Sequence, residues 1–386
     1  MITTINNKHN KLNVPNLRFK EFEGEWDKCE LGEFATIIGG YAFKSETLNS
    51  IGGKYQVVKM GNLYQNQLDL HRSPSYTDTL THKAENVILQ KDDIAITLTG
   101  TNNKRDFGYT YIFNDEKNLL LNQRCGLIRA KGNPYFLSCL LKTHTFLNQF
   151  FESATGGTGN QANVSTKAME MFSVNTPSLK EQEKIGQLMA LLDERIATQN
   201  KIIDKLQSLI KGIAQKIVRN NKPNVRLAEC LECKSSTLQE SEVCEQGTYP
   251  VYGANGIVGY LDNYSTEGEA VYIIKDGSGV GTVSYVTGKC SATGTLNTLQ
   301  AKEGYSLQYL YYLLKIFNFE PYKTGMAIPH IYFKDYGKAK VFCPSYTEQL
   351  QYARLLSAID SELSIEKNFL TSLSLQKQYL LRHMFI

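Results

Sequence analysis

The chain has 386 residues, of which 42% are hydrophobic and 21% are charged, an ordinary composition for a globular protein and a length sufficient for two domains. The polar N-terminus lacks the apolar segment of a secretory signal, and no window approaches the roughly eighteen apolar residues of a membrane helix, so the eight cysteines favour reduced thiols in the cytoplasm. The net charge of +4 is too small to indicate nucleic-acid binding by itself.

Residues 1–178 are predicted to form a first globular module of the α/β (α+β) class. Short strands are expected at 56–60, 94–99, 109–113 and 119–129, followed by a helical stretch over 134–151 and a strand that ends before Pro177. Loops rich in Gly, Asn and Thr separate these segments. Because recognition side chains tend to lie on loops that a rigid scaffold presents, these loops are the candidate binding region.

The loops of the first module carry amide and cationic side chains. They are Lys44, Lys59, Asn62, Asn102, Asn103, Lys104, Arg105 and Arg124. Such groups can pair with adenine or guanine edges and with phosphates, so they are candidate DNA contacts. For any single one a solvated loop residue is the simpler interpretation, but the cluster as a whole favours DNA binding.

A long helix is expected over 179–220. Pro177 disfavours helix before it, and Ser178 with Glu181 spells the S-x-x-E pattern of a capping box. In this range ten positions spaced alternately four and three residues apart include nine apolar residues. They are Ile185, Met189, Leu192, Ile196, Gln199, Ile203, Leu206, Ile210, Ile213 and Ile217. This spacing is typical of a coiled-coil seam. The alternative, an amphipathic helix packed on its own domain, is disfavoured because about forty residues span on the order of 60 Å.

Residues 221–344 are predicted to form a second module. Strands are expected at 270–275 and 280–286, followed by a helical stretch over 306–317 and a strand that ends before Pro344. The candidate DNA contacts of this module are Tyr252, Asn255, Lys275, Ser278, Lys323, His330 and Tyr332.

Residues 345–386 are predicted to form a second long helix that repeats the first one. At a constant offset of 167 residues, the segments from Pro177 and from Pro344 share seven identical positions, including the Glu and Gln of each Glu-Gln pair. The capping-box pattern recurs at Ser345 and Glu348, and the apolar seam recurs through Ile359 and Leu373. The polar seam residue Gln199 recurs as Glu366, and a polar seam residue commonly sets helix register.

The repeat extends upstream of the helices, in the same order in both halves. The matching segments are Leu121–Asn122 with Leu296–Asn297, Ala130–Lys131 with Ala301–Lys302, Leu140–Lys142 with Leu313–Lys315, and Thr158–Gly159 with Thr324–Gly325. We therefore predict a duplicated, pseudo-twofold molecule in which the two long helices pair antiparallel as a spacer between the modules.

Several motifs with known chemistry are absent or incomplete. The glycine-rich turn 276–281 lacks the G-x-G-x-x-G spacing of a nucleotide fold, and the turn 156–159 lacks the Lys-Ser/Thr of a P-loop. Cys230, Cys233 and Cys244 offer three zinc ligands without a fourth, so buried thiols are the favoured interpretation and no metal site is predicted. The six histidines show no metal-ligand spacing, and no catalytic constellation is found.

Four groups of residues carry a resemblance to a known family. The first is the opening 14–19 with Glu25-Trp26 and Leu31-Gly32, and the second is Gly159-Asn160-Gln161-Ala162-Asn163-Val164. The third is the segment 177–182 with 191–193, repeated at 344–349 and 358–360, and the fourth is the segment 252–256 with Gly259-Tyr260. In order and duplication, the sequence resembles a specificity subunit of the type I restriction–modification enzymes over nearly its whole length.

This resemblance implies two target-recognition domains that each read one half of a bipartite duplex DNA target. It adds Asn160, Gln161 and Asn163 to the candidate DNA contacts, although the corresponding segment 325–330 lacks the Gln and the Asn. The helices would set the gap between half-sites, with Ile185, Leu192, Gln199, Leu206, Ile359, Glu366 and Leu373 in the helix seam and partner interface.

The resemblance also implies that this chain is not an enzyme. It implies two adenine-methylating methyltransferase subunits that use S-adenosylmethionine, and restriction and translocase subunits that use ATP and Mg²⁺, as partners. Accordingly, the chain has no Asn-Pro-Pro-Tyr motif and no Walker A motif. The alternative is a coiled-coil scaffold whose modules bind peptide or carbohydrate. The DNA target, the gap length and whether the system cleaves DNA are not readable from the sequence.

Overall fold

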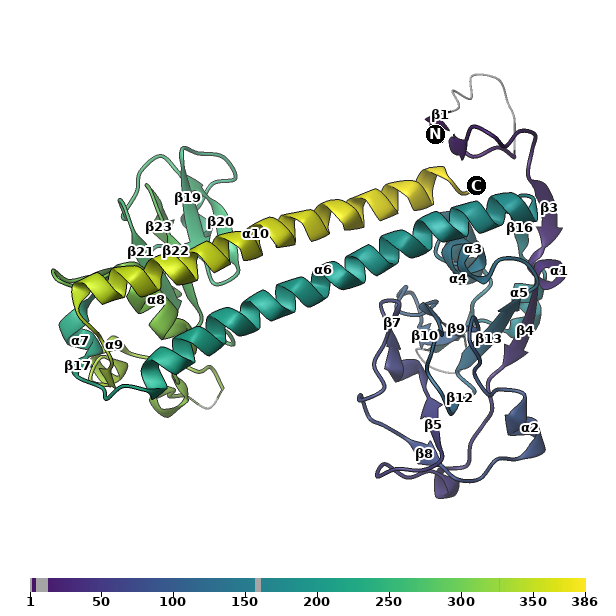
Figure 1. Cartoon of the computed structure of the whole chain (residues 1–386), viewed down its shortest axis with the longest axis horizontal. Helices are drawn as coiled ribbons and strands as arrows, with labels where there is room; N and C mark the ends of the chain where they lie inside the picture. The colour runs from purple at the N-terminus through teal and green to yellow at the C-terminus, as the bar shows by residue number, and fades with distance from the viewer. Residues whose placement is uncertain (1, 5–12, 157–160, 326) are drawn as a thin grey trace. The chain divides into compact units, whose positions relative to one another are not determined.

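The computed structural model describes residues 2–4, 13–156, 161–325 and 327–386 (Figure 1). The chain divides into two compact units, Met1–Thr198 with Leu370–Ile386 (unit 1) and Gln199–Phe369 (unit 2). Each unit contains one globular module and a part of each of the two long helices, α6 (Leu179–Arg219) and α10 (Tyr346–His383).

Unit 1 is built from short strands and short helices. Its strands are β1 (Ile2–Thr4), β2 (Leu17–Phe19), β3 (Asp27–Glu30), β4 (Ala35–Gly39), β5 (Tyr55–Val58), β6 (Leu63–Tyr64), β7 (Gln67–Leu68), β8 (Tyr76–Thr77), β9 (Ile94–Thr97), β10 (Thr99–Thr101), β11 (Thr110–Ile112), β12 (Leu119–Leu121), β13 (Cys125–Ala130), β14 (Thr155–Gly156), β15 (Gln161–Asn163) and β16 (Ser173–Thr176). Its helices besides α6 and α10 are α1 (Leu31–Phe34), α2 (His82–Glu85), α3 (Pro134–Leu140), α4 (His144–Glu152) and α5 (Thr166–Glu170), with 3-10 turns η1 (Ser45–Thr47) and η2 (Met60–Asn62).

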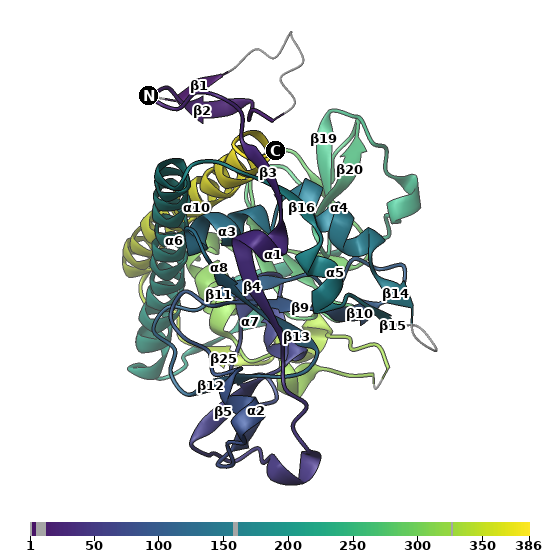
Figure 2. The same ribbon diagram turned by 90° about the vertical axis from the view of Figure 1, so that its right-hand side faces the viewer.

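The centre of unit 1 is an antiparallel four-stranded sheet in the order β11-β9-β13-β4. Alternate residues of its strands face opposite sides, as the two-residue period of a strand requires. Ile94, Ile96 and Ile128 pack against α3 and α4, whereas Ala95 and Leu127 pack against the smaller sheet β12-β5-β8. Figure 2 shows the central sheet between these two layers.

Unit 2 repeats this topology with fewer elements. Its strands are β17 (Val225–Arg226), β18 (Leu231–Ser235), β19 (Tyr249–Gly253), β20 (Gly256–Leu261), β21 (Ala270–Ile274), β22 (Val283–Val286), β23 (Ser291–Ala292), β24 (Leu296–Ala301) and β25 (Lys340–Val341). Its short helices are α7 (Leu227–Cys230), α8 (Leu307–Ile316) and α9 (Phe333–Tyr336), with 3-10 turns η3 (Glu240–Glu242) and η4 (Glu320–Tyr322).

The sheets of the two units correspond strand by strand. The order β22-β21-β24-β18 matches β11-β9-β13-β4, and the order β20-β19-β23 matches β8-β5-β12. In each unit the smaller sheet contains one parallel pair, β5 with β12 or β19 with β23. Side-chain contacts repeat as well, since Lys131 donates to the carbonyl of Gly32 and Lys302 donates to the carbonyl of Ala228. The predicted duplication is therefore confirmed at the level of topology.

Two details of the predicted repeat need correction. Leu121 ends β12, whereas Leu296 begins β24, whose counterpart is β13, so the match of Leu121–Asn122 with Leu296–Asn297 was wrong. The helical stretch 134–151 is two helices, α3 and α4, because Thr143 accepts from the amide of Phe146 and so caps a new helix. The predicted segment Thr158–Gly159 lies outside the described residues.

The long helices pair antiparallel within each unit. In unit 2, Gln199 of α6 hydrogen-bonds Glu366 of α10, and Ala214 lines a small hollow together with Leu356. In unit 1, Lys377 of α10 forms an ion pair with Asp193 of α6. Of the seam residues, Ile185, Leu192, Gln199 and Leu373 are buried, while Leu206, Ile359 and Glu366 are half-buried. Gln199 and Glu366 thus lie opposite each other in the helix pair, at the positions that the repeat relates.

The start of each long helix is tied to its own module by a glutamine. The side-chain oxygen of Gln182 accepts from the amide of Asn133, and its amide nitrogen donates to the carbonyl of Pro177. Gln349 does the same with the amide of Ser306 and the carbonyl of Pro344. The repeated Glu-Gln pair thus joins each long helix to α3 or α8.

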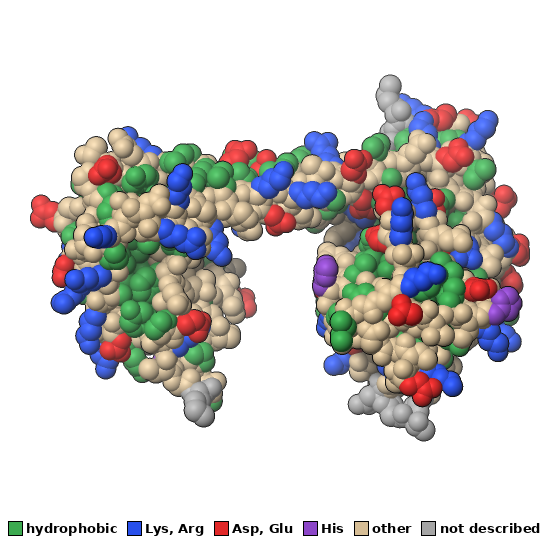
Figure 3. Space-filling model, turned by 60° about the horizontal axis from the view of Figure 1, so that its bottom comes forward, with side chains coloured by type: hydrophobic (Ala, Val, Ile, Leu, Met, Phe, Trp, Pro, Cys, Tyr) green, Lys and Arg blue, Asp and Glu red, His purple; other side chains and the backbone are tan. Residues whose placement is uncertain are grey.

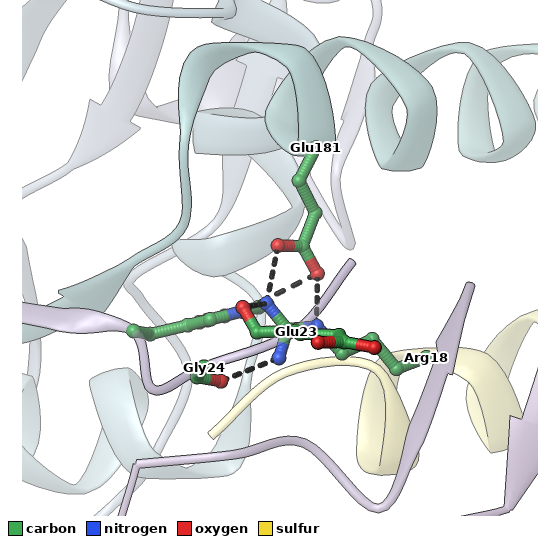
Figure 4. Close-up of polar contacts among 5 residues, drawn as sticks. Arg18, Glu23, Gly24 and Glu181 are labelled. Carbon is green, nitrogen blue, oxygen red and sulfur yellow. Dashed lines mark hydrogen bonds and ion pairs between the residues drawn. The ribbon is translucent and has the colours of Figure 1, made fainter. Parts of the chain in front are cut away.

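The two predicted capping boxes behave differently. Ser345 and Glu348 bond each other's backbone amides as predicted. The carboxylate of Glu181 instead receives two hydrogen bonds of 2.7 Å from the guanidinium of Arg18 and one of 3.4 Å from the indole of Trp26 (Figure 4). The capping-box prediction for Ser178 and Glu181 was wrong, because the carboxylate of Glu181 is hydrogen-bonded to Arg18 of the N-terminal segment.

Candidate nucleic-acid interface

The candidate loops of unit 1 meet at one end of its sheets. The amide of Leu98, just after β9, donates to the carbonyl of Arg124 (2.9 Å). The amide of Asn122, just after β12, donates to the carbonyl of Val58 (3.0 Å) at the end of β5. Consequently Arg124, Lys59 and the loop 99–105 are neighbours although they are far apart in the sequence.

Strand β15 brings the two predicted amides to this loop. β15 pairs antiparallel with β10, with Asn163 opposite Thr99 and Gln161 opposite Thr101. The hydroxyl of Thr99 donates to Oδ1 of Asn163 (2.9 Å). Gln161 and Asn163 are both exposed, so their side chains flank the exposed loop 102–105. Asn160, predicted for the same site, lies outside the described residues.

The loop 102–105 is held in a defined conformation. Asn103 has a φ of 59°, a left-handed conformation that asparagine tolerates. The carboxylate of Asp106 accepts from the backbone amide (2.8 Å) and the hydroxyl (2.7 Å) of Thr101, and these bonds lower the pKa of Asp106. The loop therefore presents Asn102, Asn103, Lys104 and Arg105 from a braced turn, which reduces the entropy that binding must remove.

The other predicted residues of unit 1 divide into exposed and structural groups. Lys44 and Arg124 are exposed, and Lys59 is half-buried. Asn62 is buried, with a 3% exposed side chain that accepts from the amide of Lys59 and donates to the carbonyls of Asp69 and Arg72. All of its polar groups are used within the loop, so we withdraw Asn62 from the expected DNA contacts.

One hairpin beside this site was not predicted. Strands β6 and β7 are joined by Gln65 and Asn66, which both have positive φ angles of 50° and 62°. Oδ1 of Asn66 accepts from the amide of Thr110 (2.8 Å), and Tyr64 packs edge-on against Tyr109 at 5.4 Å. The amide-rich sequence from Tyr64 to Gln67 was the signal that could have identified this turn as a candidate reading element.

In unit 2 the equivalent end of the sheet carries two loops, 275–281 and 324–331, that are joined by backbone hydrogen bonds. The amide of Gly277 donates to the carbonyl of Pro329 (3.0 Å), and the amide of Ile331 donates to the carbonyl of Lys275 (2.9 Å). Nδ1 of His330 lies 2.6 Å from the carboxylate of Asp276. These bonds place four of the candidate DNA contacts on neighbouring loops: Lys275, Ser278, His330 and Tyr332. Ser278 and Tyr332 are exposed.

The remaining candidates of unit 2 are less available. Tyr252 is half-buried against Tyr272, and burial raises the pKa of its hydroxyl. Lys323 forms an ion pair with Glu320 (2.5 Å). Asn255 is exposed at the tip of the β19–β20 hairpin, whose Gly256 has a φ of 107°. Asn255 is thus the better placed of the hairpin residues for a base contact.

The surface charge agrees with the small net charge of the sequence. On the face of each unit that Figure 3 shows, lysines and arginines are interspersed with aspartates and glutamates. Among the described residues, no group of His, Cys, Asp and Glu has the geometry of a metal site. Cys230 lies 3.8 Å from Cys343, whereas Cys244 is exposed, so the three cysteines considered for zinc do not converge. No helix in the described ranges combines the length and hydropathy needed to cross a membrane.

Comparison with known proteins gives one family. The family model of the type I restriction modification DNA specificity domain matches residues 23–208 and again residues 221–374. The chain is 27% identical over 180 residues to the EcoAI specificity subunit and 28% identical over 117 residues to the EcoprrI specificity subunit, both type I restriction enzymes of Escherichia coli. These segments are 46% and 30% of this chain, and in both cases the chain spans only 29% of the relative.

A solved structure shares the fold over nearly the whole chain. It is the S subunit of a type I restriction–modification system from M. genitalium, with a TM-score of 0.69 at 18% identity. The similarity covers 97% of this chain and 99% of that one.

Proposed function

The chain belongs to the type I restriction modification DNA specificity family, and on this premise we propose that it reads a bipartite duplex DNA target as a non-catalytic specificity subunit. The observation that supports this best is the duplication. Two modules of the same topology each match the DNA specificity domain, and each presents polar loops at the same end of its sheets.

The divergence of the loops supports two different half-sites. Unit 1 adds α4, which has no helical counterpart in the described part of unit 2. Its small sheet β10-β15-β14 corresponds in unit 2 only to the isolated bridges of His330 with Asp276 and Thr324. Since the scaffold is repeated but the side chains and lengths of the reading segments differ, each module would recognise its own bases.

The chemistry of the loops suits base reading in the major groove. Asn and Gln side chains can pair bidentately with adenine, and Arg can pair with guanine. The exposed amides Asn102, Gln161 and Asn163 therefore provide adenine contacts, and Arg105 or Arg124 a guanine contact. Lys44, Lys59 and Lys104 would position the phosphate backbone.

The long helices offer a surface for protein partners. In unit 2 the side chains of Ile202, Leu209, Leu355, Ile365 and Phe369 are exposed on α6 and α10. Exposed apolar patches of this kind mark protein interaction sites. We assign them to two methyltransferase subunits, which would bring S-adenosylmethionine and the adenine-methylating chemistry.

Restriction and translocase subunits would complete the assembly and would use ATP and Mg²⁺. This chain would supply recognition only and would act where the chromosome lies, in the cytoplasm.

The function is tested with purified chain, duplex DNA and S-adenosylmethionine, with and without a methyltransferase partner. We expect methyl transfer to adenine only when both proteins are present. Methylation by this chain alone would contradict a non-catalytic role. Salt-sensitive, sequence-dependent DNA binding separates this proposal from a coiled-coil scaffold for peptide or carbohydrate, which would show neither property.

A further inference from the structure

A groove extends from the recognition loop of unit 1 along helix α4. It lies between the segment 105–109 and α4, and has a volume of about 240 Å³. It continues into a second hollow of about 330 Å³ between α4 and the C-terminal part of α10. The two hollows share Lys142, His144 and Leu147 and therefore adjoin each other; together we call them the α4 groove.

The α4 groove is lined by basic and by apolar side chains. Arg105, Lys142 and His144 line its first part, and Arg382 of α10 lines its second part. Phe107 and Phe151 form apolar walls. None of the described residues that line these two hollows is an aspartate or a glutamate, whereas Glu152 lines the adjoining hollow beneath the recognition loop.

Asn148 of α4 fixes the orientation of two of these groups. The guanidinium of Arg105 donates to Oδ1 of Asn148 (3.3 Å) and lies over the ring of Phe151, 5.1 Å from its centroid. Because Oδ1 accepts from arginine, the amide nitrogen of Asn148 is the group 3.0 Å from Nδ1 of His144, to which it donates. Nδ1 is then an acceptor, and the N–H of His144 is on Nε2, on an exposed side chain.

Lys142 and Arg382 extend the same row of donors. Lys142 donates to the hydroxyl of Ser138 (3.3 Å), and burial lowers the pKa of its ammonium group, so an anion nearby would stabilise its charged form. Arg382 is exposed in the last turn of α10. The groove therefore presents donors from Arg105 to Arg382 with an apolar floor between them.

We propose that the α4 groove binds the phosphodiester backbone of one DNA strand that flanks the half-site read by unit 1. This inference rests on the proposed DNA-recognition function. Guanidinium, ammonium and imidazole N–H groups donate only, and phosphate oxygens accept only, so a row of such donors suits successive phosphates, whereas an adenine edge also requires an acceptor. The groove begins at Arg105, inside the recognition loop, so a strand leaving that loop would enter it directly.

The α4 groove distinguishes the two units. Among the described residues of unit 2 no helix corresponds to α4, and the β10-β15-β14 sheet corresponds only to the isolated bridges of His330 with Asp276 and Thr324. Backbone contacts carry no base information. The groove would thus lengthen the footprint on the side of unit 1 without adding bases to the recognised sequence.

The test compares the double variant His144→Gln/Arg382→Gln with wild type, each assembled with its methyltransferase partner. Arg105 and Lys142 stay unchanged, because one belongs to the recognition loop and the other is largely buried. The matched control is Lys91→Gln/Lys117→Gln, two exposed lysines just before β9 and β12, at the opposite end of the strands. Affinity is measured on a long target duplex and on one trimmed to the recognised sequence, over a range of salt.

We expect the groove variant to bind the long duplex about tenfold more weakly, with a salt slope lower by about one. Trimming the flanks should weaken wild type and the lysine control but leave the groove variant unchanged, and the methylated sequence should stay the same. Equal trimming losses in wild type and the groove variant, or an altered recognised sequence, would overturn the groove assignment. Failure of wild type to bind any duplex would instead refute the proposed function.

Discussion

Arg18 and Glu181 form a buried ion pair that joins the N-terminal segment to the first turns of α6. Their side chains are 5% and 1% exposed, and the guanidinium also donates to the carbonyls of Glu23 and Gly24 (Figure 4). Trp26 adds an indole hydrogen bond to Glu181 and packs edge-on against Phe385, near the end of α10. Within unit 1 the N-terminal segment therefore contacts the first turn of α6 and the residues that directly follow α10.

Breaking this pair should destabilise unit 1 strongly. We expect Arg18→Met to lower the free energy of unfolding by about 3–5 kcal/mol, because it leaves a buried carboxylate without its cation. Chemical denaturation followed by circular dichroism measures the change. The double variant Arg18→Met/Glu181→Leu should recover most of the loss, since no unpaired charge remains. A double variant as unstable as the single one would contradict the assigned role of the charge.

The reactivity of the cysteines gives a second prediction at this scale. Burial raises the pKa of Cys125 to about 12 and that of Cys139 to about 11, whereas Cys244 is exposed. Since the thiolate is the reactive form, Cys125 and Cys139 should react slowly with an aromatic disulfide reagent at pH 8, and Cys244 rapidly. The variant Cys244→Ser should lose the fast phase. Modification of Cys125 or Cys139 at the same fast rate would show that they are not buried.

Individual partners were the least predictable feature of the sequence. Ser178 and Glu181 have the local spacing of a capping box. The carboxylate of Glu181 is instead hydrogen-bonded by Arg18, which lies 163 positions earlier in the sequence. Asn62 has the chemistry of a DNA contact, yet its burial in a turn follows from hydrogen bonds to Lys59, Asp69 and Arg72. Exposed candidates such as Asn102 stay predictions, because an exposed amide does not identify the base it meets.

At the scale of elements, the long helices were predictable because their period is long and regular. The predicted ranges 179–220 and 345–386 contain α6 and α10, and the polar seam pair Gln199 and Glu366 lies where the repeat places it. Most of the predicted strands lie within a few residues of observed ones, but the predicted strand 119–129 is two strands, β12 and β13, in different sheets. Strands β4, β18, β19, β20 and β24 were not predicted. The sheet β10-β15-β14 was not predicted either, because two- and three-residue strands have no readable period.

The helix pair can be lengthened in a way that tests its proposed role as a spacer. Because Gln199 and Glu366 face each other in an antiparallel pair, seven residues inserted after each keep both seams in phase. At 1.5 Å per residue this adds about 10 Å, or about three base pairs of duplex. Mapping methylated sites should then show a gap about three base pairs longer with unchanged half-sites.

An insertion of four residues after Gln199 alone is the matched comparison. It shifts one seam against the other, so we expect reduced methylation or a changed gap. An unchanged gap in both insertion variants would rule out the helices as the spacer.

For the whole molecule, the duplication is the property that organises function. The sequence showed it most clearly in the helices, and the structure extends it to the four-stranded sheet and the smaller three-stranded sheet of each unit. The modules diverge in the loops after β9 and β21, which is expected if each reads different bases. The target itself was not predictable, because recognition depends on loop side chains brought together by long-range pairing, such as Gln161 beside Thr101.

The central claim is that each unit reads its own half of a split site, and sequencing methylated adenines in a host that carries the chain and its methyltransferase tests it most directly. We predict two short half-sites separated by a gap of fixed length and unspecified sequence. The variant Gln161→Ala/Asn163→Ala should relax bases in one half-site only, leaving the gap and the other half-site as in wild type. An uninterrupted motif, or relaxation of both halves together, would contradict reading by two independent units.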